Sequence, residues 1–435
     1  MKALADHIRA AGKKPGLWLA PFTVTANSRC YQDHPQWVIR EGPDGPPVKI
    51  LDNWGAPVYG LDCTRPEVLD YVRQVVRTMV DEWGFLLLKL DFMHHAAAVG
   101  HRYDPTIGRI EAYRRGLQTI RETVAPNIHL LGCGAPLGPA IGLVDSMRIG
   151  EDVHWTWKPT KEACLNVLMR NWQHRQWWIN DPDCVMLRPT GDVMEMTTDE
   201  QLFLATVVAM SGGSLLVSDN MATLPAERWE ILGKLLPVYG QPMQVLGWLA
   251  EYPDWLELNL RAAWGHWRIL GLLNWEDHPR PLTLDFDVLA MALRPVERAS
   301  ACHVFDFWRN QYSRVMPGFQ LKLLTPPHSA HLLLIRPITE RPSFVACTRH
   351  WSQGKVDLAN MEWDRETNTL VLDLLPTGNL RGELIFHIPP PYQLQQVGAQ
   401  GLEVLEWGPA PQHMATVAVE VRERGTLILQ CSVRE

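Results

Sequence analysis

The segment Leu86–Asp91 places a cation and a carboxylate at the end of a short apolar run. An apolar run of this length predicts a buried strand, and side chains two residues apart on a strand share a face. We therefore expect Lys89 and Asp91 to point the same way from the end of that strand. Two opposite charges in this position indicate either a buried ion pair or a site where the carboxylate acts on a substrate.

A second acid follows another predicted strand, in the run Arg148-Ile149-Gly150-Glu151-Asp152. If the strand continues that far, Asp152 shares the face of Arg148. Two acids at the ends of separate strands could flank a bond, one as the nucleophile and the other as the acid and then the base. The structural alternative is a pair of buried ion pairs, Lys89 with Asp91 and Arg148 with Asp152. Spacing alone leaves both interpretations open.

Two further polar groups have weaker signals. The run Asn180-Asp181-Pro182-Asp183 follows an extended segment with two tryptophans, and on its own it favours a tight turn. His94 and His95 lie near Asp91, but no third ligand stands at a metal-binding spacing, so we expect solvated loop histidines. No phosphate loop, dinucleotide fingerprint or Gly-x-Ser-x-Gly elbow is present. The sequence predicts neither a metal site nor a cofactor.

The elements that must position these residues alternate between helix and strand over the first 245 residues. This order predicts an α/β fold with a parallel sheet, and the polar residues cluster at its carboxyl edge, as they do in a (β/α)8-type barrel. About six βα units are present. The predicted strands lie at about 16–20, 85–91, 128–132, 145–150, 177–180 and 214–218.

Local signals define several boundaries within this region. Thr64-Arg65-Pro66-Glu67 and Thr197-Thr198-Asp199-Glu200 predict capping boxes at the starts of two helices. Residues 22–60 form a long polar stretch with many Pro and Gly residues, which predicts a loop that acts as a lid or rim.

After about residue 245 the pattern changes to short apolar runs separated by Pro, Gly, Asn and Asp, which predicts antiparallel β structure. We divide the chain into a partial (β/α)8 catalytic barrel (1–245), a β-sandwich (246–338) and a second C-terminal β unit of unknown role (339–435).

Composition bounds the class of protein. The chain has 435 residues and a net charge of −7, so no basic face for nucleic acid is expected. No apolar run reaches the roughly 18 residues that span a membrane, and no signal peptide is evident. Eight scattered Cys without a Cys-x-x-Cys pair indicate reduced thiols and a cytoplasmic protein. The 19 Trp residues suit stacking on sugar rings, although core filling explains most Trp residues in most proteins.

Taken together, these motifs resemble the clan D α-galactosidases, glycoside hydrolase families 27 and 36. The resemblance covers about residues 1–340 and rests on the three acidic motifs in their order and spacing. It also includes Lys14–Pro21, Gly60–Val68, Ser211–Asp219 and the sandwich motifs Leu273-Asn274-Trp275, Asp306-Phe307-Trp308 and Pro327-His328-Ser329.

The resemblance implies a retaining hydrolase of terminal α-linked galactose that needs no cofactor. Asp91 would be the nucleophile and Asp152 the acid/base, with the two carboxyl groups about 5 Å apart. Lys89 and Arg148 would hold sugar hydroxyls or tune the carboxylates, and Trp18 would line the sugar subsite. The residues that would bind the substrate are Trp18, Lys89, Cys133, Arg148 and Asp183.

Relative to family 36, the β domain, two βα units and the Asp-Asp-Gly-Trp motif that precede this region are missing. The chain is therefore expected to be N-terminally truncated and weakly active or inactive alone. The alternatives are a hydrolase of another α-glycoside, such as an α-N-acetylgalactosaminide or an α-glucoside, or a non-catalytic carbohydrate-binding homologue. The expected partner is an α-galactoside, with no nucleic acid and no membrane, and the sequence leaves a homo-oligomer open.

Overall fold

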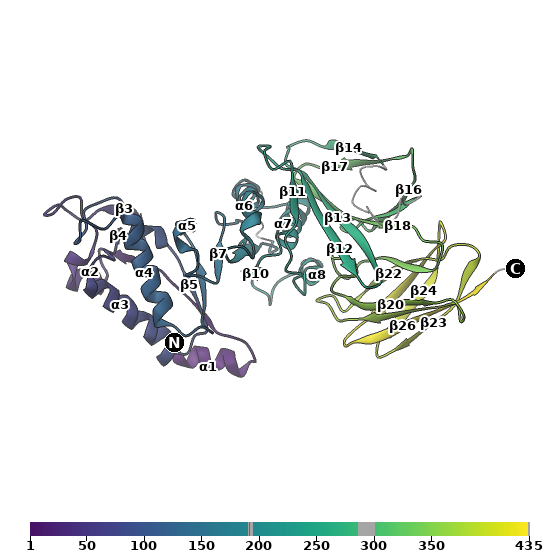
Figure 1. The fold of residues 1–435 in the computed structure, drawn as a ribbon, viewed down its shortest axis with the longest axis horizontal. Helices are drawn as coiled ribbons and strands as arrows, with labels where there is room; N and C mark the ends of the chain where they lie inside the picture. Colours follow the sequence, from purple (N-terminus) through teal and green to yellow (C-terminus); the bar gives the residue numbers. More distant parts are fainter. Residues whose placement is uncertain (190, 192–194, 286–300, 434–435) are drawn as a thin grey trace. The chain divides into compact units, whose positions relative to one another are not determined.

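The computed structural model describes residues 1–189, 191, 195–285 and 301–433 (Figure 1). The chain divides into two compact units. The first contains Met1–Ile149 and Gln173–Asp181, and the second contains Gly150–Trp172 and Pro182–Glu435.

The first unit is built on a five-stranded parallel sheet in the order β1-β5-β6-β7-β8. Each strand corresponds to one of the first five predicted strands, although most are shorter than expected. Parallel pairing aligns the carboxyl ends of these strands along one edge of the sheet. Their bounds are β1 Gly16–Leu19, β5 Leu87–Leu90, β6 His129–Gly132, β7 Ser146–Arg148 and β8 Ile179–Asp181.

Helices α3 (Pro66–Arg77) and α4 (Arg109–Thr123) pack side by side in the same unit (Figure 1). The helix α3 buries Val68, Val72 and Val76, one turn apart on a single face. The capping box predicted at Thr64 is wrong, because α3 is capped at Arg65 without a side-chain hydrogen bond. The Thr64 hydroxyl donates instead to the buried Asp62 carboxylate at 2.7 Å. The remaining helices of the unit are α1 (Lys2–Ala10), α2 (Arg29–Asp33) and α5 (Leu137–Ala140), with the 3-10 helices η1 (Pro35–Trp37) and η3 (Met93–Ala97) and the π-helical segment η2 (Thr78–Glu82).

Residues 22–60 are not the structureless loop that their Pro and Gly content predicted. They contain a three-stranded antiparallel sheet in the order β2-β4-β3, with β2 at Thr23–Thr25, β3 at Lys49–Asn53 and β4 at Ala56–Gly60. Strands of three to five residues are too short to give a clear alternating pattern among so many turn residues. The hairpin β3–β4 carries Trp54 and Gly55 in its turn.

The second unit begins with further α/β elements. The sixth predicted strand is observed as β10 (Leu216–Val217), which pairs in parallel with β9 (Cys184–Val185). The capping box predicted at Thr197 is confirmed at the start of α7, where the Thr197 side chain and Glu200 satisfy each other's backbone N–H groups. The helices are α6 (Trp157–Arg170), α7 (Thr198–Ser211) and α8 (Ala226–Lys234), with the short turn η4 at Asn171–Gln173.

Antiparallel β structure fills the rest of the second unit. A six-stranded sheet has the order β11-β12-β13-β18-β15-β16 and is accompanied by the pair β14–β17. Two four-stranded sheets follow, β19-β22-β25-β24 and β20-β21-β26-β23, and they enclose a common apolar core (Figure 1). The predicted fold class, a parallel α/β region followed by antiparallel β sheets, is confirmed. The predicted domain boundaries at 245 and 338 stay a prediction. The strand bounds are β11 Gln244–Leu246, β12 Trp255–Ala262, β13 Gly265–Asn274, β14 Arg280–Asp285, β15 Cys302–Asp306, β16 Gln311–Val315, β17 Gln320–Thr325, β18 Ser329–Pro337, β19 Ser343–Cys347, β20 Leu358–Asp364, β21 Thr369–Leu374, β22 Arg381–His387, β23 Tyr392–Gln400, β24 Glu403–Ala410, β25 Met414–Glu420 and β26 Gly425–Val433.

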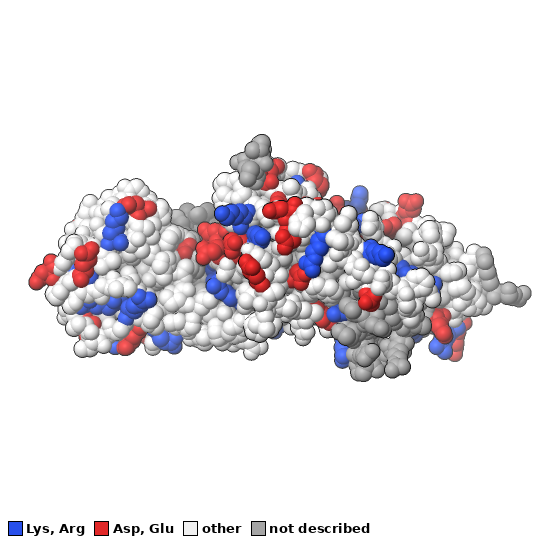
Figure 2. All heavy atoms as spheres, turned by 90° about the horizontal axis from the view of Figure 1, so that it is seen from above, with Lys and Arg blue, Asp and Glu red and all other residues white. Residues whose placement is uncertain are grey.

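Two observations concern the surface charge and the length of the apolar helices. On the face shown in Figure 2, basic and acidic side chains are interspersed among uncharged ones, and no continuous basic stripe is visible among the described residues. Within the described ranges, no helix combines the length and apolar character that crossing a bilayer would require.

Candidate active site

Asp91 stands at the carboxyl end of β5, where the parallel ladder fixes its backbone. Its N–H donates to the Leu19 carbonyl of β1 at 2.9 Å, which continues the register that pairs Trp18 with Lys89. Both carboxylate oxygens accept hydrogen bonds. The Trp18 indole Nε1–H donates to Oδ2 at 2.9 Å, and the Phe92 backbone N–H donates to Oδ1 at 2.7 Å. The half-buried carboxylate is thus held in one orientation at the edge of the sheet.

Strand β6, the neighbour of β5, brings Cys133 and Gly134 next to Asp91. The Cys133 N–H donates to the Leu90 carbonyl at 2.7 Å, one residue beyond the end of β6. Gly134 has a φ of +52°, and a Cβ built there would lie 3.1 Å from the Phe92 nitrogen and 3.2 Å from Asp91 Oδ1. A glycine is therefore required both by the left-handed backbone and by the close approach to the carboxylate.

Three other predicted residues influence the pKa of the Cys133 thiol. Burial is the main cause that raises the pKa of the Cys133 thiol to about 12, and the Asp91 carboxylate raises it further, whereas Lys89 and Arg148 oppose the rise. At this pKa the thiol is protonated at neutral pH and is a weak hydrogen-bond donor. Arg148 is almost fully buried and stands opposite Asp181 in the β7–β8 register.

The buried ion pair considered for Lys89 and Asp91 is not formed. Among the described residues, no ion pair within 4.0 Å joins these two side chains, although both belong to the edge of the same strand. The partners of the Asp91 carboxylate are neutral donors instead. The interpretation in which Asp91 is available to a substrate is therefore favoured over the structural alternative.

The turn that follows Asp91 is strained and partly buried. Phe92 has φ +52° and ψ +31°, a left-handed conformation that costs a bulky residue about 1–2 kcal/mol. His94 is exposed and donates from Nδ1 to the Gly134 carbonyl at 2.8 Å. The expectation of a solvated loop residue is wrong for His95, which is fully buried with Nδ1 2.9 Å from the Thr23 hydroxyl. Burial, reinforced by His94, lowers the pKa of His95 to about 4.

A cluster of aromatic side chains reaches the carboxylate through Trp18, and the sequence indicated only one of them. The three-ring cluster consists of Trp18, Trp54 and Phe92, in mutual edge-to-face contact with centroid separations of 5.3–6.4 Å. Trp18 and Trp54 are 46% and 48% exposed, so neither is a core residue. Trp54 and Phe92 were missed in the sequence. The available signal was a Trp inside the turn sequence Asn53-Trp54-Gly55.

The other predicted acids belong to the second unit. β7 ends at Arg148, so the condition under which Asp152 would share the face of Arg148 is not met. Asp152 is exposed in the segment that follows the strand. Asp183 is buried at a φ of +74° and accepts a hydrogen bond at 2.9 Å from the N–H of Val153, next to Asp152. Asp183 thus positions the segment that carries Asp152. The acid/base role of Asp152, the substrate contact of Asp183 and the 5 Å carboxyl separation stay predictions.

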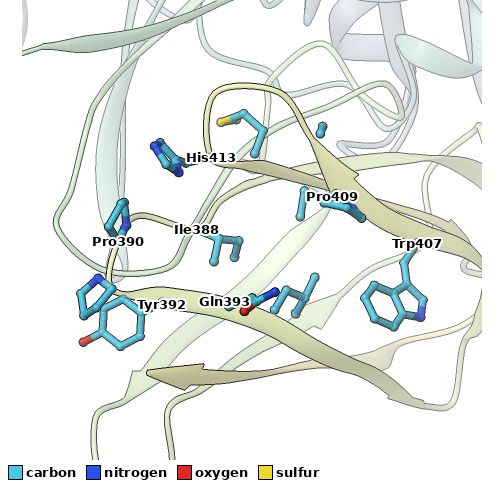
Figure 3. Close-up of a pocket in the computed structure, with 12 residues that line it drawn as sticks. Ile388, Pro390, Tyr392, Gln393, Trp407, Pro409 and His413 are labelled. Carbon is cyan, nitrogen blue, oxygen red and sulfur yellow. The ribbon is translucent and has the colours of Figure 1, made fainter. Parts of the chain in front are cut away.

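A pocket of about 420 Å³ occurs elsewhere in the second unit, between the edge strands β23 and β24 of the last two sheets. Figure 3 shows Tyr392 and Trp407 at opposite ends of it, with Ile388 and Gln393 between them. None of its described lining residues is an Asp or a Glu. This pocket therefore supplies no carboxylate for acid–base or nucleophilic chemistry, and the edge of the parallel sheet at Asp91 remains the candidate active site.

Comparison with known proteins shows what the chain resembles. Residues 1–136, which include Asp91, match the Melibiase family model. An α-galactosidase of Pediococcus pentosaceus is 29% identical over 115 residues, which are 26% of this chain and 15% of that enzyme. The structure of an α-galactosidase from Thermus thermophilus in complex with p-nitrophenyl α-D-galactopyranoside is 32% identical, with a TM-score of 0.48, and the match covers 57% of this chain and 52% of that one.

The fold is shared more widely. A glycoside hydrolase family 27 β-L-arabinopyranosidase from Geobacillus stearothermophilus is 16% identical, with a TM-score of 0.57, and the match covers 78% of each chain. The likeness to this enzyme lies in the fold, a parallel α/β region followed by antiparallel β sheets. Residues 1–136 are similar to melibiases, and the chain spans only 15–18% of the length of the curated α-galactosidases it matches.

Proposed function

We propose that the protein hydrolyses terminal α-linked galactose with retention of configuration, with Asp91 as the nucleophile. The observation that carries this proposal is the Asp91 carboxylate. It ends β5 inside the segment matched to melibiases, and neutral donors hold both its oxygens while no cation within 4.0 Å neutralises it among the described residues. A carboxylate that is oriented and not consumed by an ion pair is suited to attack an anomeric carbon.

In the first step, one Asp91 oxygen bonds to the anomeric carbon as the glycosidic C–O bond breaks. Asp152, as a carboxylic acid, gives its proton to the departing oxygen, so that an alcohol leaves and a galactosyl ester of Asp91 remains. In the second step, Asp152 as the carboxylate takes a proton from water, whose oxygen attacks the anomeric carbon and releases galactose and the Asp91 carboxylate.

The remaining predicted residues have supporting roles in this proposal. Asp91, Lys89 and Arg148 all influence the pKa of Cys133, and in this proposal Lys89, Cys133 and Arg148 supply donors to sugar hydroxyls. Trp18 both orients the carboxylate and offers a half-exposed ring face for the C–H face of the sugar. Asp183 acts by holding the Val153 N–H beside Asp152.

The purified protein is tested with p-nitrophenyl glycosides of α-galactose, α-N-acetylgalactosamine and α-glucose. We expect weak but measurable turnover of the α-galactoside in preference to the other two, its abolition in Asp91→Ala, and unchanged turnover in Asp70→Ala, whose carboxylate is exposed on α3. A fluorinated galactosyl fluoride should label Asp91 covalently, as detected by peptide mass spectrometry. Labelling elsewhere would refute the nucleophile, preference for another sugar would refute the substrate, and a protein that binds galactosides without turnover would be the non-catalytic homologue.

The role of Asp152 is tested separately. In Asp152→Ala, turnover of a substrate with a good leaving group such as p-nitrophenol should fall less than turnover of an alkyl galactoside, because the general acid matters most for a poor leaving group. Added azide should restore the second step by replacing the activated water, with the α-galactosyl azide as its product. Equal losses for both substrates and no response to azide would refute the assignment.

A further inference from the structure

The tip of the β3–β4 hairpin carries Trp54 in a conformation that its side chain does not favour. Asn53 and Ala56 pair across the turn, and the two residues between them, Trp54 and Gly55, have φ values of +51° and +77°. Two positive φ values are typical of a tight hairpin turn, but Asn, Asp or Gly usually occupies both positions. A bulky residue at positive φ is a real outlier, and such strain is often found at ligand-binding sites.

Trp54 gains little from burial in this position. Its side chain is 48% exposed, whereas a Trp that stabilises a core is largely buried. Its ring lies edge-on to Phe92 at a centroid separation of 5.3 Å and to Trp18 at 6.4 Å. Trp18 in turn donates to Asp91 Oδ2. The hairpin therefore places a ring at the rim of the carboxylate site, one side chain further from Asp91 than Trp18.

We propose that Trp54 forms the leaving-group subsite of the active site and binds a ring-bearing group, either a second sugar or an aryl group, that is attached to the galactose. This inference rests on the function proposed above. The anomeric carbon must reach the Asp91 carboxylate, so the galactose lies against the strand ends beside Trp18 and Lys89. The leaving group then extends outward from the sheet.

Trp54 lies on a hairpin outside the parallel sheet and is 48% exposed, so its ring is accessible to a group that points outward. Its exposed face offers apolar area and a π surface to the C–H face of a pyranose or to an aryl ring. A leaving group without a ring cannot use this contact. Trp54 is thus expected to raise the rate for ring-bearing leaving groups only.

The test compares p-nitrophenyl α-galactoside with α-galactosyl fluoride, whose leaving group has no ring. In Trp54→Ala, kcat/KM should fall about tenfold for the aryl substrate and stay within about twofold for the fluoride. Trp54→Phe, which keeps a ring face, should recover most of the loss. Trp248→Ala removes a Trp that is 60% exposed in the second unit and serves as the matched control, with no change for either substrate.

Other outcomes refute the inference. Equal losses on both substrates would show that Trp54 serves the galactose or merely supports Trp18, and no loss on either would show that the ring is idle. If Trp54→Ala lowers the Tm, the two substrates are compared in Trp54→Phe instead, which retains the apolar contact with Phe92. If the unsubstituted protein hydrolyses neither substrate, the proposed function itself fails and this subsite falls with it.

Discussion

Gly134 offers a direct test of whether Asp91 must be held in its observed position. In Gly134→Ala the new Cβ would lie 3.2 Å from Asp91 Oδ1 and 3.1 Å from the Phe92 nitrogen, closer than an ordinary contact of 3.4–4 Å. A shift of a few tenths of an ångström is needed to relieve these contacts. It would disturb the hydrogen bonds of 2.9 and 2.7 Å that orient the carboxylate.

The magnitude of the effect follows from two separate causes. An alanine at a φ of +52° costs about 1–2 kcal/mol of stability, whatever surrounds it. Displacing a reacting group by 1 Å costs about 100-fold in rate, so a shift of a few tenths of an ångström should lower kcat about five- to tenfold.

Gly142 separates the two causes. It has a φ of +80°, and a Cβ there would meet nothing within 4 Å. Gly142→Ala should therefore lose a similar 1–2 kcal/mol of stability but no activity. The assay is kcat on p-nitrophenyl α-galactoside together with the urea midpoint of each variant. If Gly134→Ala and Gly142→Ala have the same kcat, the contact with Asp91 does not matter and the reasoning is refuted.

Three further predictions concern stability. Burial lowers the pKa of His95 and of His350 to about 4, below the value of 6.5 in an unfolded chain, so the unfolded state binds more protons between pH 6.5 and 4. The free energy of unfolding should therefore fall as the pH falls through this window, by about 1–3 kcal/mol for each group. His350→Gln should lessen this dependence of the free energy of unfolding on pH. A urea midpoint that is the same at pH 7.5 and pH 4.5 would contradict the prediction. Arg336→Leu should destabilise the protein by about 3 kcal/mol, because the guanidinium now donates to the buried carbonyls of Phe344 and Gln353 at 3.0 Å each, and both would lose this donor. Arg314→Leu, at an exposed position on β16, is the control. Equal Tm values for the two variants would argue against a structural role for Arg336. Thr197→Ala should lower the free energy of unfolding by about 1–2 kcal/mol, because the capping box of α7 is lost. Thr198→Ala, one residue inside the helix, is the control and should be nearly neutral. The prediction fails if the urea midpoints of the two variants coincide.

The comparison of Thr64 with Thr197 shows how far local sequence signals extend. Both begin a Thr-x-x-Glu pattern before an apolar helical stripe, and both predict a capping box. Thr197 forms the box, whereas the Thr64 hydroxyl donates to Asp62, whose other oxygen accepts from the N–H of Tyr103. A distant backbone segment thus decides the use of the Thr64 side chain, and no local pattern contains that information.

The sequence by itself determined the order of the elements and the place of the key carboxylate. Apolar runs and helical periodicity are local properties, so all six predicted strands have counterparts, and Asp91 stands at the end of β5 as expected. The alignment of the carboxyl ends of β5, β6 and β7 also follows from the predicted parallel order.

Only the tertiary structure decided what surrounds the Asp91 carboxylate. The contacts of Trp54 with Trp18 and Phe92 join segments far apart in the chain and depend on a hairpin hidden in a stretch rich in Pro and Gly. The burial of His95 and the approach of Gly134 to Asp91 likewise depend on how neighbouring segments pack. Residue types and spacing specify which groups could react. Non-local packing fixes their hydrogen bonds, their pKa values and the rings beside them, because these depend on atoms that the chain brings together only when it folds.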